Sequence, residues 1–272
     1  MCCTVATRPT SVIGAFPTWG RSLLGEFAAI VGSSSRPFPC TFAVSALRRG
    51  NLRYAFIASS TEETAWWPLP EILTRYVSVA PGIGRRTSLV VFFRPDHEPL
   101  PIGDYELTLW RLLQFLHDRD PKPWPAHIPL QTDSEYWEFC FAGEAIFVVC
   151  STPAHRRRAS RRSSSFVVTF QPRWVFDGLG AELREGSRAR GKIRRRMAGY
   201  DVVSPHPELG PYGDPRYREW RQYFLPDENQ PQKWTCPLKV GRCAQPAERP
   251  RGELPGASSP HRAARPVCVP AA

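Results

Sequence analysis

The residues with the clearest chemical potential form an arginine-rich run, HRRRASRRSSS, at residues 155–165. Guanidinium groups pair bidentately with carboxylates and phosphates, so a run of this kind beside a pocket can hold an anionic substrate or cofactor. The same run could contact nucleic-acid phosphates, or it could form a solvated loop, which composition alone favours. All three interpretations stay open at this point.

Eight cysteines offer redox or metal chemistry, but their spacing excludes the commonest motifs. None forms a CxxC pair, and no Cys/His spacing fits a zinc finger. Cys140 and Cys150 lie in apolar, strand-like runs, where a buried thiol behaves as a small hydrophobic side chain. The N-terminal residues lack the pattern of a secretory signal and no apolar run is long enough to cross a bilayer. We therefore expect a cytoplasmic protein with reduced thiols and no membrane partner.

Nucleotide-binding motifs are not recognisable in the sequence. Gly82 and Gly84 lie in PGIGRRT, where the third glycine of a dinucleotide fingerprint is missing and no strand directly precedes the run. No Walker motif and no nucleophile elbow occurs either. We expect the chain to have no site of its own for ATP, a flavin or a nicotinamide.

Hydrophobic periodicity indicates a mixture of helices and strands. Helical spacing of apolar residues, together with a basic stretch near residue 190, predicts helices over residues 21–31, 40–49, 103–118 and 188–200. Runs of β-branched and aromatic residues predict strands at residues 52–58, 88–93 and 166–170, and a hairpin from 136–141 and 145–151. Because helices and strands do not alternate regularly, we expect an α+β fold with a central, largely antiparallel sheet flanked by helices.

Length and composition indicate a single mixed domain with a loosely structured segment at each end of the chain. The 272 residues carry a formal net charge of +11 and are 42% hydrophobic, enough for a substantial core. We expect an N-terminal arm at 1–19, one domain at 20–229 and a disordered tail at 230–272, which has 8 prolines and few large apolar residues.

Aromatic residues are not interleaved among the arginines as stacking platforms for bases would be, so we expect no nucleic-acid partner.

Several separated segments resemble the YqcI/YcgG family. They are PFPCTFA (37–43), LWRLLQFLHDRDPKPWP (109–125), YWEFCFAGEAIFVVCSTPAHRRRASR (136–161), FQPRWVFD (170–177) and YDVVSPHPELGPYGDPRYREWRQYFLPDE (200–228). The resemblance covers roughly residues 20–228 and is more specific than any single motif above. Family members with assigned chemistry include haem-dependent N-hydroxylases of guanidino amino acids, one of them in D-cycloserine biosynthesis.

The resemblance implies haem b as the cofactor, and a haem iron needs an axial ligand from the protein. Cys40 follows Pro39 at an expected helix start, where backbone N–H groups stabilise a thiolate. A thiolate ligand favours O–O cleavage, which suits hydroxylation of a guanidinium. His155, at the end of the hairpin strand, is the other candidate, because a neutral imidazole also binds haem iron. Either residue could instead be structural; thiolate chemistry favours Cys40.

Further residues in the resembling segments have expected roles around the haem. Arg158, Arg161 and Arg173 are candidates to pair with the haem propionates. Burying the substrate guanidinium requires a carboxylate, and Glu138 in YWEFCF is the first candidate for it. A salt bridge from Glu138 to an internal arginine is an equally good interpretation. Asp177 is the second candidate.

The activity that the resemblance implies is a haem-dependent monooxygenase. It would convert L-arginine to Nω-hydroxy-L-arginine in antibiotic (D-cycloserine) biosynthesis, using O2 or peroxide. Because no flavin or nicotinamide site is recognisable, we expect an external electron donor. A downstream hydroxyarginine hydrolase is the expected pathway partner. A haem-binding sensor or carrier without catalysis is the alternative, and it would not need the guanidinium-binding carboxylate.

Overall fold

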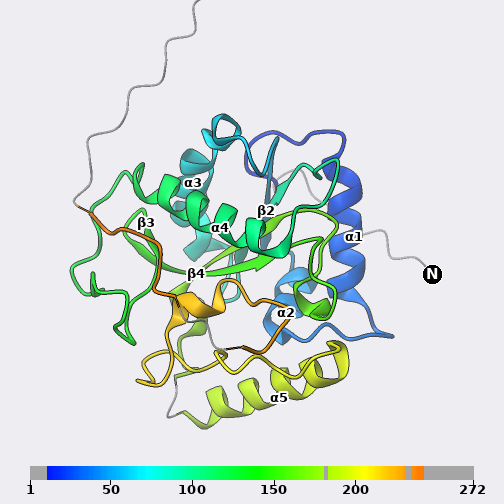
Figure 1. Cartoon of the computed structure of the whole chain (residues 1–272), viewed down its shortest axis with the longest axis vertical. Helices are drawn as coiled ribbons and strands as arrows, with labels where there is room; N and C mark the ends of the chain where they lie inside the picture. The colour runs from blue at the N-terminus through cyan, green and yellow to red at the C-terminus, as the bar shows by residue number, and fades with distance from the viewer. Residues whose placement is uncertain (1–10, 181–182, 231–233, 242–272) are drawn as a thin grey trace, which may run out of the picture.

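A computed structural model describes residues 11–180, 183–230 and 234–241 as an α+β structure around one five-stranded sheet (Figure 1). The strands lie in the order β1-β2-β5-β4-β3. Their bounds are β1 Leu52–Ile57, β2 Ser88–Phe93, β3 Cys140–Phe141, β4 Glu144–Ser151 and β5 Val167–Pro172. β1 pairs in parallel with β2 and the other neighbours are antiparallel, which confirms the expected mixed, largely antiparallel sheet.

Helices cover both faces of the sheet, and the alternation of strand side chains separates the two layers. On one face, α3 (Leu69–Ile83) and α4 (Ile102–His117) pack against Leu89, Val91 and Phe93 of β2. On the other face, α1 (Gly20–Gly32) and α2 (Thr41–Arg49) pack against Val90 and Phe92. β2 is therefore buried on both sides, and this explains its uninterrupted apolar sequence, SLVVFF.

A fifth helix and four short 3-10 helices complete the described structure. α5 (Arg184–Tyr200) lies on the same side of the sheet as α2 (Figure 1). The short helices are η2 (Glu63–Trp66), η3 (Ala159–Arg161), η4 (Arg173–Phe176) and η5 (Glu219–Gln222). No helix in the described part of the chain is long and apolar enough to cross a membrane.

One predicted strand is shortened in the structure, and one helix is present that the sequence does not predict. The first strand of the expected hairpin is reduced to Cys140–Phe141, because the backbone of residues 134–139 forms turns and an irregular segment although Trp137, Glu138 and Phe139 are fully buried. The sequence also predicts no element between β1 and β2, where α3 forms. Pro70 is tolerated in the first turn of α3, and Pro81 lies close to its end.

The folded core extends past both expected domain boundaries. Val12 forms a bridge with Tyr54 of β1 and Ile13 is buried, although 1–19 was expected to be a loose arm. Leu238 is buried against the core and Trp234 packs beside it, although 230–272 was expected to be disordered. Residues 1–10, 231–233 and 242–272 of those two segments lie outside the described residues.

Candidate functional site

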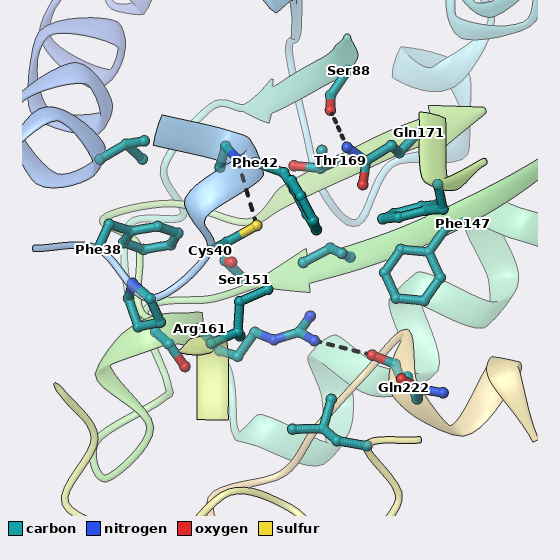
Figure 2. Close-up of a pocket in the computed structure, with 18 of the residues that line it drawn as sticks. Phe38, Cys40, Phe42, Ser88, Phe147, Ser151, Arg161, Thr169, Gln171 and Gln222 are labelled. Carbon is teal, nitrogen blue, oxygen red and sulfur yellow. Dashed lines mark hydrogen bonds between the residues drawn. The ribbon is translucent and has the colours of Figure 1, made fainter. Parts of the chain in front are cut away.

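A large cavity lies between the sheet and helices α1, α2 and α5. Its volume is about 660 Å³, within the range of roughly 300–1,000 Å³ that is usual for ligand and cofactor sites. The sheet contributes the side chains that face away from α3 and α4, including Phe147 and Val149 of β4 and Thr169 and Gln171 of β5. Phe38, Phe42 and Phe176 add aromatic surface. The exposed surface of the lining is mainly apolar, although arginines, carboxylates and hydroxyl groups also contribute to it (Figure 2).

Cys40 lines this cavity at the beginning of α2. It is the N-cap residue, and its Sγ accepts a hydrogen bond from the backbone N–H of Ala43 at 3.5 Å. Pro39 ends the preceding loop, so the chain enters the helix with the thiol held in place by its first turn. Figure 2 draws this hydrogen bond as a dashed line from the sulfur of Cys40. The expected helix start at Cys40 is confirmed to within one residue.

Opposing effects act on the pKa of the Cys40 thiol. Burial raises it, and this is the dominant effect. The backbone N–H groups of Ala43 and Phe42 and the charges of Arg161 and Arg86 act in the other direction, since they favour the thiolate. The surroundings of Cys40 thus include the groups that would stabilise a thiolate once a metal ion displaced the proton.

Arg161 is the buried cation of the same part of the cavity. Its Nη1 donates to the carbonyl of Cys150 at 3.3 Å and its Nη2 to the carbonyl of Gln222 at 3.1 Å. Figure 2 shows the side chain extending toward Gln222. Burial lowers the pKa of Arg161 to about 10, so the group stays charged at neutral pH. Because both carbonyl acceptors are neutral, the charge of Arg161 favours an anionic ligand group.

Arg173 lies at another part of the cavity lining and is held by two carboxylates. Its Nε lies 2.6 Å from Oε1 of Glu138, and its Nη2 forms an ion pair with Oε2 of Glu219. The guanidinium carbon stacks over the ring of Tyr212, 4.1 Å from the ring centre. Arg173 therefore already has carboxylate partners, which makes it a poor candidate for a propionate.

Glu138 is the fully buried carboxylate partner of Arg173 and does not line the cavity. Burial raises the pKa of its carboxyl group, while Arg173 and the Tyr212 hydroxyl act to lower it. The alternative interpretation from the sequence, a salt bridge to an internal arginine, describes what the structure contains. The cavity lining instead includes the carboxylates of Glu219, Glu26 and Asp177, of which only Asp177 was a sequence candidate.

His155 and Arg158 lie away from the cavity and have structural contacts. The two ring nitrogens of His155 lie 2.9 Å from the Thr152 hydroxyl and 2.9 Å from the Leu225 carbonyl. Burial lowers the pKa of His155 to about 4. Arg158 donates from Nε to the Pro226 carbonyl at 3.0 Å and from Nη2 to the side chain of Asn229 at 2.7 Å. Binding iron through His155 would require at least one of its hydrogen bonds to break.

Sequence reasoning missed Glu219, Gln222 and Tyr212, all of which line the cavity. Glu219 and Gln222 are three residues apart in η5, so their side chains lie on the same side of the short helix. The segment REWRQYF was part of the resembling sequence, and this spacing was the available signal. In the described part of the chain, no group of three or more His, Cys, Asp and Glu side chains could hold a metal ion.

Comparison with known proteins places these residues in a family context. The chain is 40% identical over 226 residues to "Uncharacterized protein YqcI" of Bacillus subtilis (strain 168), covering 82% of this chain and 88% of that protein. It is 39% identical over 225 residues to "Uncharacterized protein YcgG" of the same organism, with the same coverage of each chain. No solved structure matches the chain.

A third relative has a name that states an activity. The chain is 34% identical over 226 residues to the Streptomyces lavendulae protein named "Putative N(omega)-hydroxy-L-arginine synthase DcsA", covering 81% of this chain and 84% of that protein. The sequence profile of the YqcI/YcgG family matches residues 27–239, which include Cys40, Arg161, Arg173 and Glu219. The chain therefore belongs to the YqcI/YcgG family.

Proposed function

We propose that this protein is a haem-dependent monooxygenase that hydroxylates a guanidino nitrogen of L-arginine, in antibiotic (D-cycloserine) biosynthesis. The name of the Streptomyces lavendulae relative supports arginine as the substrate. The observation that carries the proposal is the position of Cys40, which is the N-cap residue of α2 and lines a large, mainly apolar cavity. The proposed location is the cytoplasm.

The residues around the cavity fit an iron porphyrin. Cys40 offers a sulfur ligand; burial raises the pKa of its thiol, while backbone N–H groups and the charge of Arg161 favour the thiolate that an iron ion would bind. Arg161 offers a buried cation for one propionate, and the rings of Phe38, Phe42 and Phe147 offer apolar surface for the macrocycle. Haem with a thiolate ligand supplies the electron density that O–O cleavage needs.

The proposed reaction consumes L-arginine, O2, two electrons and two protons, and it yields Nω-hydroxy-L-arginine and water. An external reductase or small reductant supplies the electrons, or hydrogen peroxide replaces O2, the two electrons and the two protons together. The protein's own residues hold the porphyrin through Cys40 and Arg161 and exclude bulk water with the apolar lining. A hydrolase that acts on hydroxyarginine is the proposed downstream partner.

The test uses the purified full chain loaded with haem. We expect its reduced, CO-bound form to show a strongly red-shifted Soret band, and L-arginine with reductant and O2 to give a product heavier by one oxygen atom. A protein that stays colourless after expression with ample haem would overturn the proposal. A haem-loaded protein that never turns over arginine, with reductant or with peroxide, would leave the non-catalytic sensor or carrier as the better assignment.

A further inference from the structure

The ion-pair network at Arg173 holds an unequal number of charges. Glu138 and Glu219 both contact the guanidinium of Arg173, and their side chains are 0% and 4% exposed. With both carboxylates ionised, these three side chains carry a net negative charge in a buried place. A buried charge without a partner is strongly unfavourable. A proton on Glu138, which the raised pKa of that carboxyl group favours, or one further cation beside Glu219 would balance this charge.

Glu219 is the carboxylate of this network that lines the cavity, and one of its oxygens accepts no hydrogen bond. Its Oε2 is paired with Arg173, while its Oε1 is buried and has no hydrogen-bond partner among the described residues. Glu219 lines the cavity, whereas Glu138 does not. An ionised carboxylate accepts several hydrogen bonds, so this oxygen can still receive donors from a ligand.

The surroundings of Glu219 suit a planar cation. The guanidinium of Arg173 already stacks on two aromatic rings that line the cavity, at 4.1 Å from the ring centre of Tyr212 and 5.4 Å from that of Phe176. Phe147, also in the lining, packs edge-on against Phe176 with ring centres 5.6 Å apart. A carboxylate beside aromatic faces is a suitable setting for a second guanidinium, through charge-assisted hydrogen bonds and cation–π contact.

We propose that Oε1 of Glu219 accepts hydrogen bonds from the cationic end of the ligand, and that a guanidinium is the group it selects. This inference deepens the proposed function and rests on it for the choice of arginine as the probe. Arg173 acts as a positioning residue, because it holds Oε2 of Glu219 and leaves Oε1 for the ligand. Glu138 pairs with the charge of Arg173 outside the cavity lining and does not contact the ligand.

A consequence is discrimination between a guanidinium and a neutral group of the same shape. L-citrulline has nearly the shape of L-arginine, but its ureido group carries no charge. A buried carboxylate oxygen gains much more from a charged donor than from a neutral one. We expect the protein to bind L-arginine at least tenfold more tightly than L-citrulline.

The experiment measures the Kd of L-arginine and of L-citrulline by calorimetry on the haem-loaded full chain and on its Glu219→Gln variant. We expect Glu219→Gln to raise the Kd of L-arginine more than tenfold and to change that of L-citrulline little, so that the preference is lost. Glu208→Gln is the matched control, since Glu208 pairs with Arg221 at 3.1 Å and does not line the cavity. If Glu219 had a merely structural role, its substitution would raise the Kd of both ligands by similar factors.

Hydroxylation assays on the same samples separate the two proposals. Unchanged arginine affinity in Glu219→Gln, with the wild type still turning arginine over, would overturn the role of Glu219 and leave the function intact. Glu219-dependent binding without any turnover would support the site and overturn the function. Equal affinity of the wild type for the two ligands, or no binding of arginine, would also overturn the site. Should Glu219→Gln not fold, Glu219→Asp keeps the charge but withdraws the carboxylate by one methylene group, and we expect a smaller loss of L-arginine affinity with L-citrulline affinity little changed.

Discussion

Arg173 and Glu138 form an ion pair, with Nε of the arginine 2.6 Å from Oε1 of the glutamate, although they lie on different elements. Glu138 precedes β3 and Arg173 begins η4, directly after β5. Because Glu138 is fully buried, its charge depends on this partner. The pair thus fastens the irregular segment before β3 to the end of β5.

Removing Arg173 should destabilise the fold strongly. Arg173→Leu leaves Glu138 and Glu219 facing each other without a cation, and we expect a loss of about 3–5 kcal/mol in the free energy of unfolding. Urea denaturation measures this loss. The double variant Arg173→Leu/Glu138→Gln should recover part of it, because one buried charge is gone. A single variant as stable as the wild type would show that the carboxylates are protonated or solvated.

Serine and alanine at position 40 should separate two roles of Cys40. Serine is a good N-cap residue and alanine is not, so we expect Cys40→Ala to lose about 1 kcal/mol of stability and Cys40→Ser to lose less. Both variants lack the sulfur, so both should lose a red-shifted Soret band in the reduced, CO-bound form. Persistence of that band in either variant would place the iron ligand elsewhere.

Acid should weaken the fold through His155. Its pKa is about 4 in the folded protein, because burial disfavours the charged ring, against an ordinary value of 6.5. The unfolded chain therefore binds the proton first, and stability falls as the pH drops from about 6.5 to 4 and then levels off. The contribution is about 3 kcal/mol. We expect His155→Gln to be less stable at neutral pH and to show a shallower fall, measured as the unfolding free energy at a series of pH values. An equally steep fall would exclude His155 as the cause.

Two glycines in α5 should respond oppositely to alanine. A Cβ at Gly186 would lie 2.3 Å from the backbone oxygen of Leu179, so Gly186→Ala must displace the start of the helix, and we expect a loss of about 1–3 kcal/mol. Gly191 has nothing within 4 Å of a Cβ, and Gly191→Ala should stabilise the protein by about 0.5–1 kcal/mol. Melting curves of the two variants test this. Equal effects would mean that α5 does not pack against Leu179.

Local sequence patterns predicted the parts of the site that depend on local structure. The helix start at Cys40 was predictable, because Pro39 precedes a helical pattern and the N-cap is a property of adjacent residues. The β4 and β5 strands were predictable from their aromatic and β-branched residues.

The partners of buried charged residues could not be predicted in this way. Glu138, Arg173 and Glu219 meet across more than 80 positions of sequence, and nothing local to any of them indicates the other two. His155 was a candidate haem ligand at the end of a strand, but one of its ring nitrogens lies 2.9 Å from the carbonyl oxygen of Leu225, 70 residues later in the chain. Helix α3 was missed because its two prolines resemble loop signals.

The segment at residues 234–241 has a practical consequence for anyone shortening this chain. Trp234 packs against Trp110 and Trp220, with ring centres 5.9 and 5.2 Å away, and the side-chain amide of Gln114 bonds to both backbone groups of Lys239. Removing all residues after residue 229 would remove these contacts and expose the indole rings of Trp110 and Trp220 to solvent. Such a protein should express poorly and precipitate, whereas one ending after Gly241 should stay in solution.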